Sequence, residues 1–453
     1  MYFEPIFAPL THFSAVPIGV VRVSGENCWD LCQKFLRPAK PRKPNVVYLS
    51  KFVDPDSQEI IDEGLVVFFR GPKSFTGEDV VELYPHGNSL ILQKLSAVLN
   101  RLGIRLAEPG EFSKRAFLNG KLDLPQAEAL ADLISAKSEK HLQFARRNYF
   151  GEFSQQLTLV HEDLRNLLAT LEATIDFAEE DLGDVHEKFF EESASRLKAN
   201  LEKMLKGYDL TKKLYEGLQI CFLGKVNAGK SSCFNLILGK ERAIVSPEAG
   251  TTRDFIEAQL EIGGVLVKLV DLAGIRDTEN IVEKKGIELA LDIASKSDLI
   301  LFVVAANECF DQDELILKLN SFKAEKWLVL TKIDLVSENE VEETCRKLSN
   351  FFNVVLKICA LNADYRQPLL DKLTAFVESL NLDSSFSVYS DRQKELFKSA
   401  VKHLDRFLQD QTNTWDMRCE EIRLALRSVD QVLGKTYVED LLGLIFSKFC
   451  IGK

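Results

Sequence analysis

The chain has 453 residues, 46% of them hydrophobic, and a formal net charge of −11 at pH 7. That length allows about three domains, and the acidic balance argues against indiscriminate binding to nucleic acid. No apolar run approaches the roughly 18 residues of a membrane span, and the first residues lack a basic and apolar leader, so we expect neither a membrane segment nor a signal peptide. Nine cysteines without repeated CxxC pairs are typical of reduced thiols and predict a cytoplasmic protein.

The first 121 residues have the texture of a small α+β unit. Strands are predicted at 18–23, 46–52 and 65–69, and helices at 27–36 and 88–102. Residues 37–44 alternate basic side chains with prolines, which predicts an exposed loop in preference to a phosphate contact. Composition alone indicates no function for this unit.

From Leu124 the apolar residues take up the spacing of long helices. Residues 127–171 keep that spacing for many turns, and one stripe within it is predicted to lie in a bundle core: Phe153, Leu157, Val160, Leu164, Leu167, Leu171 and Ile175. Helical texture returns after Leu380. We therefore expect a discontinuous helical bundle, built from both flanks of an inserted domain. The predicted boundaries are 1–121, 122–216, 217–380 and 381–453.

The most specific motif is a phosphate-binding loop, Gly-Lys-Val-Asn-Ala-Gly-Lys-Ser, at residues 224–231. An apolar run at 218–223 predicts a buried strand before it, and residues 232–238 predict a helix after it, which is the context that the motif needs. The loop's N–H groups and the helix N-terminus would bind phosphates. Lys230 is expected to reach the β- and γ-phosphates, and Ser231 to bind Mg²⁺ through its hydroxyl.

Further segments follow in the order of a GTP-binding domain. Thr252, in the segment Gly-Thr-Thr-Arg-Asp, is the expected second Mg²⁺ ligand. Asp271 and Gly274 bound an Asp-x-x-Gly segment, which puts a carboxylate near the metal's water shell and an N–H near the γ-phosphate. In Thr-Lys-Ile-Asp at 331–334, the carboxylate can accept two donors of guanine that adenine does not offer, so GTP is the predicted substrate. The strands of this domain are predicted at 218–223, 255–262, 265–270, 299–304, 327–330 and 353–358.

The groups that would hydrolyse GTP are less evident. Ile275 follows the Asp-x-x-Gly segment and cannot orient water, so catalysis must depend on other groups. The side chain of Asn227 either holds a monovalent cation with carbonyls of 246–250 or braces the loop, and residue type favours neither. Three glutamates follow closely enough to act through a water, and position alone does not distinguish them: Glu279, Glu283 and Glu288.

Segments on both sides of the predicted nucleotide domain carry a resemblance to a known family. They are Ser-Phe-Thr-Gly-Glu-Asp at 74–79, Pro-Gly-Glu-Phe-Ser at 109–113, Arg-Ala-Phe-Leu-Asn at 115–119, Lys-Leu-Asp-Leu at 121–124 and Phe-Cys-Ile-Gly-Lys at 449–453. Together with 227–232, 250–254 and 271–274, they resemble the bacterial tRNA modification GTPase family MnmE (TrmE), over essentially the whole chain. Thr331 stands where that family's guanine motif usually has Asn.

The resemblance implies a fold with three parts and a set of site residues. The expected fold class is multidomain: an N-terminal α+β tetrahydrofolate-binding-like domain, the discontinuous helical bundle, and an inserted Ras-like P-loop GTPase domain. The implied GTP-binding residues are Asn227, Ala228, Gly229, Lys230, Ser231, Ser232, Ser246, Thr251, Thr252, Asp271, Gly274, Thr331, Lys332, Asp334, Cys359 and Ala360. The implied K⁺ ligands are Asn227, Ser246, Glu248 and Thr251. The implied catalytic residues are Lys230 and Glu283, with Glu283 as the water-activating acid.

The resemblance also implies a second cofactor and several partners. The N-terminal domain would bind a 5-formyl- or 5,10-methylene-tetrahydrofolate through Arg22, Glu82, Lys121 and Lys453, and would form a homodimer. A heterotetramer with the FAD- and NADH-using flavoprotein MnmG (GidA) would add an aminomethyl or carboxymethylaminomethyl group at C5 of the wobble uridine (U34) of certain tRNAs. Cys450 is a candidate nucleophile in that chemistry. The alternative is a small residue that docks the tail, which we favour because no His lies in the last fifty residues.

Two functions from different classes are compatible with these motifs. The leading one is an enzyme, a K⁺-dependent GTPase that drives wobble-uridine modification. The alternative is a GTP-gated regulatory or ribosome-assembly switch without a direct role in modification. An attached RNA-binding module such as a KH domain would favour the switch, and its GxxG signature is not found.

Overall fold

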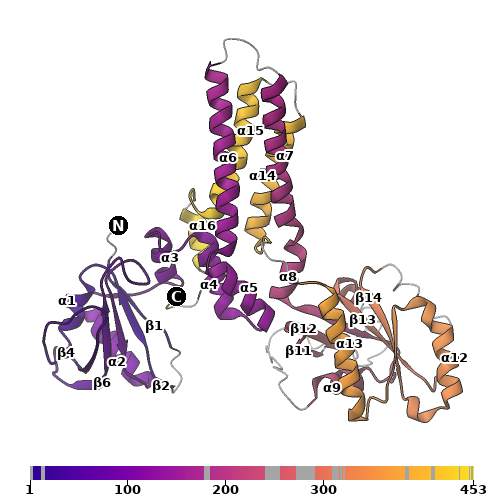
Figure 1. Cartoon of the computed structure of the whole chain (residues 1–453). Coiled ribbons are helices and arrows are strands. Elements are labelled where there is room, and N and C mark those ends of the chain that lie inside the picture. Colours follow the sequence, from indigo (N-terminus) through magenta and orange to yellow (C-terminus); the bar gives the residue numbers. More distant parts are fainter. Residues whose placement is uncertain are drawn as a thin grey trace, which may run out of the picture. The chain divides into compact units, whose positions relative to one another are not determined.

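The computed structural model (Figure 1) describes most of the chain. The described residues are 4–11, 16–177, 184–239, 256–271, 291–308, 316, 319, 322–382, 387–409, 414–437, 439–447, 449 and 452. They form two compact units: Met1–Ser135 with Ala145–Lys203 and Asp391–Lys453, and Ala136–Phe144 with Met204–Ser390. Within these described ranges, no helix is long and apolar enough to cross a membrane.

The N-terminal part of the first unit is built on a seven-stranded sheet. Its strands, in spatial order, are β4 (Leu36–Arg37), β5 (Val47–Val53), β6 (Ile60–Phe69), β7 (Val80–Tyr84), β3 (Val21–Ser24), β1 (Ile6–Pro9) and β9 (Arg105–Leu106). The helices α1 (Cys28–Gln33) and α2 (Ser89–Arg101) contribute buried apolar residues to the same core as the sheet. Helix α3 (Glu111–Leu118) follows β9. The helices predicted at 27–36 and 88–102 are confirmed, with slightly shorter bounds.

The prediction of one continuous strand at 18–23 is wrong, because the strand is interrupted at Gly19. Residues Val16–Ile18 form β2, which pairs with β8 (His86–Gly87) in a separate two-stranded sheet, and β3 belongs to the main sheet. The N–H of Gly19 donates to the carbonyl of Pro85. A Cβ at Gly19 would lie 3.0 Å from the Leu92 side chain, so the break occurs where the backbone passes close to α2.

Long helices from both flanks of the second unit pack into one bundle (Figure 1). Its main members are α4 (Leu124–Ser135), α6 (Glu152–Phe177), α7 (Asp184–Lys206), α14 (Asp391–Gln409) and α15 (Trp415–Leu433), with the short α16 (Glu439–Phe446) after them. The stripe predicted on α6 is buried from Phe153 to Leu171, as expected for core, and Ile175 is half-buried. Polar contacts join the flanks as well: Nε2 of His161 lies 2.8 Å from Oδ1 of Asp430.

The second unit contains a six-stranded sheet. Its strands, in spatial order, are β11 (Ile256–Ile262), β12 (Val265–Asp271), β10 (Leu218–Leu223), β13 (Leu299–Ala305), β14 (Glu325–Thr331) and β15 (Val354–Lys357). Only the β11–β12 pair is antiparallel. Gly263 and Gly264 join it with φ angles of 58° and 77°, the left-handed pair that a type I′ hairpin requires. All six predicted strands are confirmed within about two residues.

The second unit also contains several helices, and its two ends are joined by a backbone hydrogen bond. It contains α9 (Lys230–Leu238), α12 (Glu338–Leu348), α13 (Arg366–Ser379), α8 (Tyr208–Glu216) and the first residues of α5 (Glu139–Tyr149). The ring of His141 lies against the ring of Tyr215, with centroids 4.4 Å apart. Where the chain enters and leaves the unit, the N–H of Val388 donates to the carbonyl of Met204 at 3.2 Å. The two connections to the bundle therefore begin side by side.

Candidate functional site

The predicted phosphate-binding loop joins β10 to α9, the parallel strand and helix that the motif needs. Gly224 has φ 147°, and a Cβ there would lie 2.1 Å from the carbonyl oxygen of Val303, so no side chain fits. Asn227 and Gly229 are both left-handed, with φ angles of 63° and 96°. Left-handed residues within a tight loop turn N–H groups toward one side, which makes a concave site for an anion.

Lys230 is the cation of this loop. The side chain is buried, and its Nζ donates to the carbonyls of Gly224 and Lys225 at 2.9 and 2.7 Å. Burial lowers the pKa of Lys230, and the Asp271 carboxylate opposes that shift. The Lys230 ammonium group is therefore already positioned for a phosphate, and its charge is not fully balanced by nearby anions.

Ser231 and Asp271 form the candidate Mg²⁺ site. The Ser231 hydroxyl donates to Oδ2 of Asp271 at 2.7 Å, and the carboxylate, at the end of β12, is buried. One neutral and one anionic oxygen side by side suit a hard divalent cation that keeps most of its waters. The other predicted ligand, Thr252, lies outside the described residues. So do the following predicted residues: Ser246, Glu248, Thr251, Gly274, Glu283, Cys450 and Lys453.

The predicted base-recognition segment touches the phosphate-binding loop through Thr331. The hydroxyl of this buried residue donates to the carbonyl of Ala228 at 2.5 Å. A Cβ at Gly229 would lie 3.2 Å from the Thr331 hydroxyl oxygen. Thr331 therefore braces one loop against the other. Lys332 is left-handed, with φ 53°, and turns the chain so that Asp334 stands exposed in the next turn.

A pocket of about 620 Å³ lies between α9 and the loop that follows β15. Its lining residues are Ser232, Asn235, Leu236, Gly239, Ala360, Leu361, Ala363 and Arg366. The fold thus brings Ser232 and Ala360, two predicted nucleotide-binding residues far apart in sequence, to one cavity. That volume is typical of small-molecule sites.

Asn227, for which two roles stayed open, is exposed at the tip of the loop. Among the residues that the structure describes, its side chain makes no hydrogen bond. A bracing role within this part of the chain is thus not observed.

A second candidate site lies in the first unit, on β3 and β7. Arg22 and Glu82 face each other in the strand register, and Nε of Arg22 donates to Oε1 of Glu82 at 2.9 Å. The hydroxyl of Tyr84 donates to the other carboxylate oxygen of Glu82. Burial and that carboxylate raise the pKa of Tyr84 to about 12, so it remains a donor at neutral pH. Lys121, the third predicted residue, donates to the carbonyl of Pro72 at 3.0 Å.

Two aromatic residues at this site were not predicted from the sequence. The guanidinium carbon of Arg22 lies 4.8 Å from the ring centroid of Phe75 and 5.7 Å from that of Phe112. Contacts at this distance favour a cation over a ring face. Phe75 and Phe112 both occur in the segments that carry the family resemblance, which is the one sequence feature that could have pointed to them.

Gly452 reaches the same region. It is buried with φ 99°, and a Cβ there would lie 2.8 Å from the carbonyl oxygen of Pro9, at the end of β1. Because β1 is paired with β3, the strand that carries Arg22, Gly452 lies against the strand next to this site.

The comparisons with known proteins extend over nearly the whole chain. Residues 5–121 match the family model described as GTP-binding protein TrmE N-terminus, and residues 124–450 match that of the MnmE helical domain. A protein of Aquifex aeolicus named tRNA modification GTPase MnmE is 40% identical over 99% of this chain and 100% of its own length. The chain belongs to the MnmE (TrmE) family. Relatives of the same name from Thermotoga maritima and Thermoanaerobacter pseudethanolicus are 36% and 33% identical, over 96% and 100% of this chain and 97% and 100% of their own.

Family membership fixes the activity of the nucleotide site. This MnmE-family chain is a GTP hydrolase, and its phosphate-binding loop is the one between β10 and α9. GTP hydrolysis in such a loop uses Mg²⁺, for which Ser231 and Asp271 supply suitable oxygens.

Proposed function

We propose that this chain hydrolyses GTP to drive modification of the wobble uridine of certain tRNAs, adding an aminomethyl-type group at C5. The observation that carries the proposal is the whole-chain match to the MnmE family, which includes both flanks of the GTP-binding unit. A switch that used only the nucleotide domain would give no reason for the Arg22–Glu82 site in the first unit.

In the nucleotide site, Lys230 and the loop N–H groups would hold the β- and γ-phosphates. Ser231 and Asp271 would orient Mg²⁺, which neutralises charge that develops on the phosphate oxygens. K⁺, held by Asn227 with Ser246, Glu248 and Thr251, would supply the positive charge that an Arg finger gives in other GTPases. The exposure of Asn227 at the tip of the phosphate-binding loop supports this reading. Glu283 would activate the attacking water.

In the first unit, Arg22, Glu82, Lys121 and Lys453 would bind a tetrahydrofolate one-carbon derivative. The Arg22–Glu82 pair offers a donor fork and an acceptor next to aromatic rings, which suits a ligand with a polar heterocycle. The close approach of Gly452 to Pro9 supports a role for the adjacent Lys453. In this arrangement, Cys450 serves to dock the tail.

The proposed assembly is a homodimer that binds the flavoprotein MnmG, together forming a heterotetramer that receives tRNA. The flavin would supply the redox chemistry of the modification. We place this assembly in the cytoplasm. The seven cysteines in the described part of the chain are all free, which suits a reducing compartment.

Two measurements test the proposal. Nucleoside mass spectrometry of tRNA from cells that lack the protein should show the loss of the modified wobble uridine, restored by the wild-type chain but not by Lys230→Ala. Unchanged wobble uridines would leave the regulatory or ribosome-assembly switch as the better reading. GTP hydrolysis by the purified chain should be faster in K⁺ than in Na⁺, and equal rates would remove the proposed cation site.

A further inference from the structure

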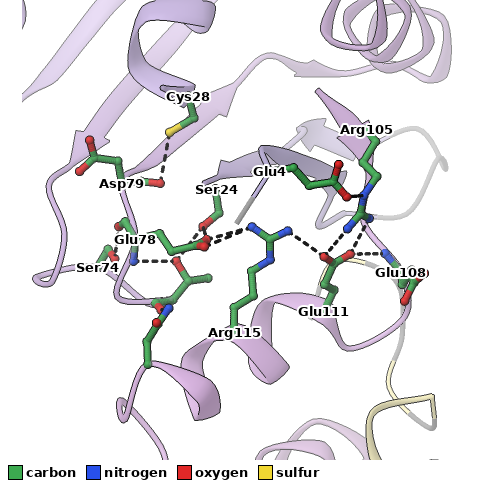
Figure 2. Close-up of polar contacts among 12 residues, drawn as sticks. Glu4, Ser24, Cys28, Ser74, Glu78, Asp79, Arg105, Glu108, Glu111 and Arg115 are labelled. Carbon is green, nitrogen blue, oxygen red and sulfur yellow. Dashed lines mark hydrogen bonds and ion pairs between the residues drawn. The ribbon is translucent and has the colours of Figure 1, made fainter. Parts of the chain in front are cut away.

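Figure 2 shows a polar network that includes Ser24, a residue of the strand that also carries Arg22. Its centre is Arg115 on α3, which is almost fully buried. Nη1 of Arg115 donates to both carboxylate oxygens of Glu78 at 3.2 Å, and Nη2 donates to Oε1 of Glu111 at 2.8 Å. The two carboxylates come from different elements, since Glu78 is in the loop between β6 and β7 and Glu111 begins α3.

The same two elements carry the rings that flank Arg22. Phe75 belongs to the loop of residues 74–79, called here the Phe75 loop, and Phe112 belongs to α3. Arg115 therefore ties together the two supports of the Arg22 guanidinium, and Asn119, at the C-terminal end of α3, adds a hydrogen bond from its Nδ2 to the carbonyl of Thr76 at 2.8 Å. A planar guanidinium that holds two carboxylates fixes both position and orientation, which a lysine ammonium does not do.

A second connection links the network to the strand of Arg22 itself. Ser24 is two residues from Arg22 on β3, so both side chains point to the same face of the sheet. The Ser24 hydroxyl donates to Glu78 at 2.6 Å and lies 2.7 Å from the Thr76 hydroxyl. The Phe75 loop is thus held on one side by β3 and on the other by α3.

We propose that Arg115 is a positioning residue for the ligand site at Arg22 and Glu82. It sets the position of Phe75 relative to Phe112, and through the Phe75 ring it orients the Arg22 fork toward a bound folate. This inference rests on the proposed folate site and adds the residues that shape it. Arg115 itself does not touch the ligand.

Folate binding to the purified full-length chain tests the proposal. With 5-formyltetrahydrofolate as the probe in calorimetry, Arg115→Gln and Phe75→Ala should each raise Kd about tenfold or more, and the double variant should lie within about twofold of the weaker single variant, since both changes act through one ring. Arg115→Lys, which keeps the charge, covers the case in which the Gln variant does not fold, and its Kd should also rise.

The matched control is Arg105→Gln. Arg105 donates to Glu111 from the outer end of the network, at 2.7 and 2.8 Å, and makes no contact with Glu78. Its removal should leave Kd within about twofold of wild type if only the link to the Phe75 loop matters. GTP hydrolysis should be unchanged in all these variants, because each substitution lies in the first unit.

A spectroscopic signal tests the positioning role of Arg115 independently of folate binding. The Nε–Hε resonance of Arg22, assigned by its loss in Arg22→Lys, reports the bond to Glu82 without any folate. It should shift or broaden in Arg115→Gln and Arg115→Lys and stay in place in Arg105→Gln. If the wild-type chain binds no folate, the ligand proposal fails and this resonance alone decides the positioning role. A resonance unmoved by both Arg115 variants, or Arg115 and Phe75 effects on Kd that add, would overturn the inference.

Discussion

The hydroxyl of Thr331 is expected to stabilise the nucleotide unit. Thr331→Val keeps the shape of this buried side chain and removes the donor that the Ala228 carbonyl accepts at 2.5 Å. The loss leaves a carbonyl of the phosphate-binding loop without that donor, which costs about 1–3 kcal/mol. For a unit of this size, the melting temperature should fall by about 2–12 °C.

Thermal unfolding of the nucleotide-free chain, followed by near-ultraviolet circular dichroism, measures this change. Thr344→Val is the matched control, because the half-buried Thr344 hydroxyl donates a solvent-exposed hydrogen bond to the carbonyl of Glu340 on α12. That variant should lose less than about 0.5 kcal/mol. Preference for guanine over adenine nucleotides should survive in Thr331→Val, since Asp334 is unchanged. A Thr331→Val protein as stable as the control would refute the bracing role.

Three further predictions follow from burial and charge. Burial favours the protonated form of Glu111, but hydrogen bonds from Arg105, the Glu108 N–H and Arg115 outweigh it and lower its pKa to about 2. The free energy of unfolding of the first unit should therefore fall by about 3 kcal/mol as pH falls from 4.5 to 2. Unfolding measurements on Glu111→Gln should lack this loss of stability in acid. Burial lowers the pKa of His141 to about 4, so the folded second unit binds fewer protons than the unfolded chain between pH 6.5 and 4. Its free energy of unfolding should fall by about 3 kcal/mol as pH falls across that window. A His141→Phe variant with the same pH dependence would contradict this assignment. Gly224→Ala should abolish GTP binding in equilibrium dialysis, because its Cβ would overlap the Val303 carbonyl, while Gly120→Ala, with no atom within 4 Å of its added Cβ, should bind GTP normally.

The nucleotide unit was the most predictable part of the chain. Its central strands are buried on both faces, so they appear in the sequence as continuous apolar runs, and β10 has the predicted bounds of 218–223. The two glycines at 263–264 marked the hairpin, because only that turn needs two left-handed residues in succession. The predicted continuous spacing from 127 to 171 is instead divided among α4, α5 and α6, with left-handed Gly151 at the second break.

The first unit was less predictable because its contacts are long-range. Strand β7 was missed, since it is short and carries Glu82, whose burial depends on Arg22 sixty residues earlier. The placement of Phe75 and Phe112 on Arg22 also joins three separate segments, and no local pattern records it. Thr331 was assigned to the base site by its motif position, and only the folded chain shows its hydroxyl bonded to the phosphate-binding loop. Motif and resemblance thus indicated candidate sites, but not how the residues of each site support one another.

The division of the bundle between two distant segments imposes an order on biosynthesis. Helix α6 ends at Phe177, and its partner α15 begins at Trp415, so roughly 240 residues, or about 10–50 s of translation, separate the two. Throughout that interval, the apolar stripe of α6 leaves the ribosome without the helix that will cover it. The GTP-binding unit can fold meanwhile, and its Met204–Val388 hydrogen bond joins the two segments that lead to the bundle. A nascent chain stalled before α15 should accordingly recruit chaperones at α6, while its nucleotide pocket is already competent.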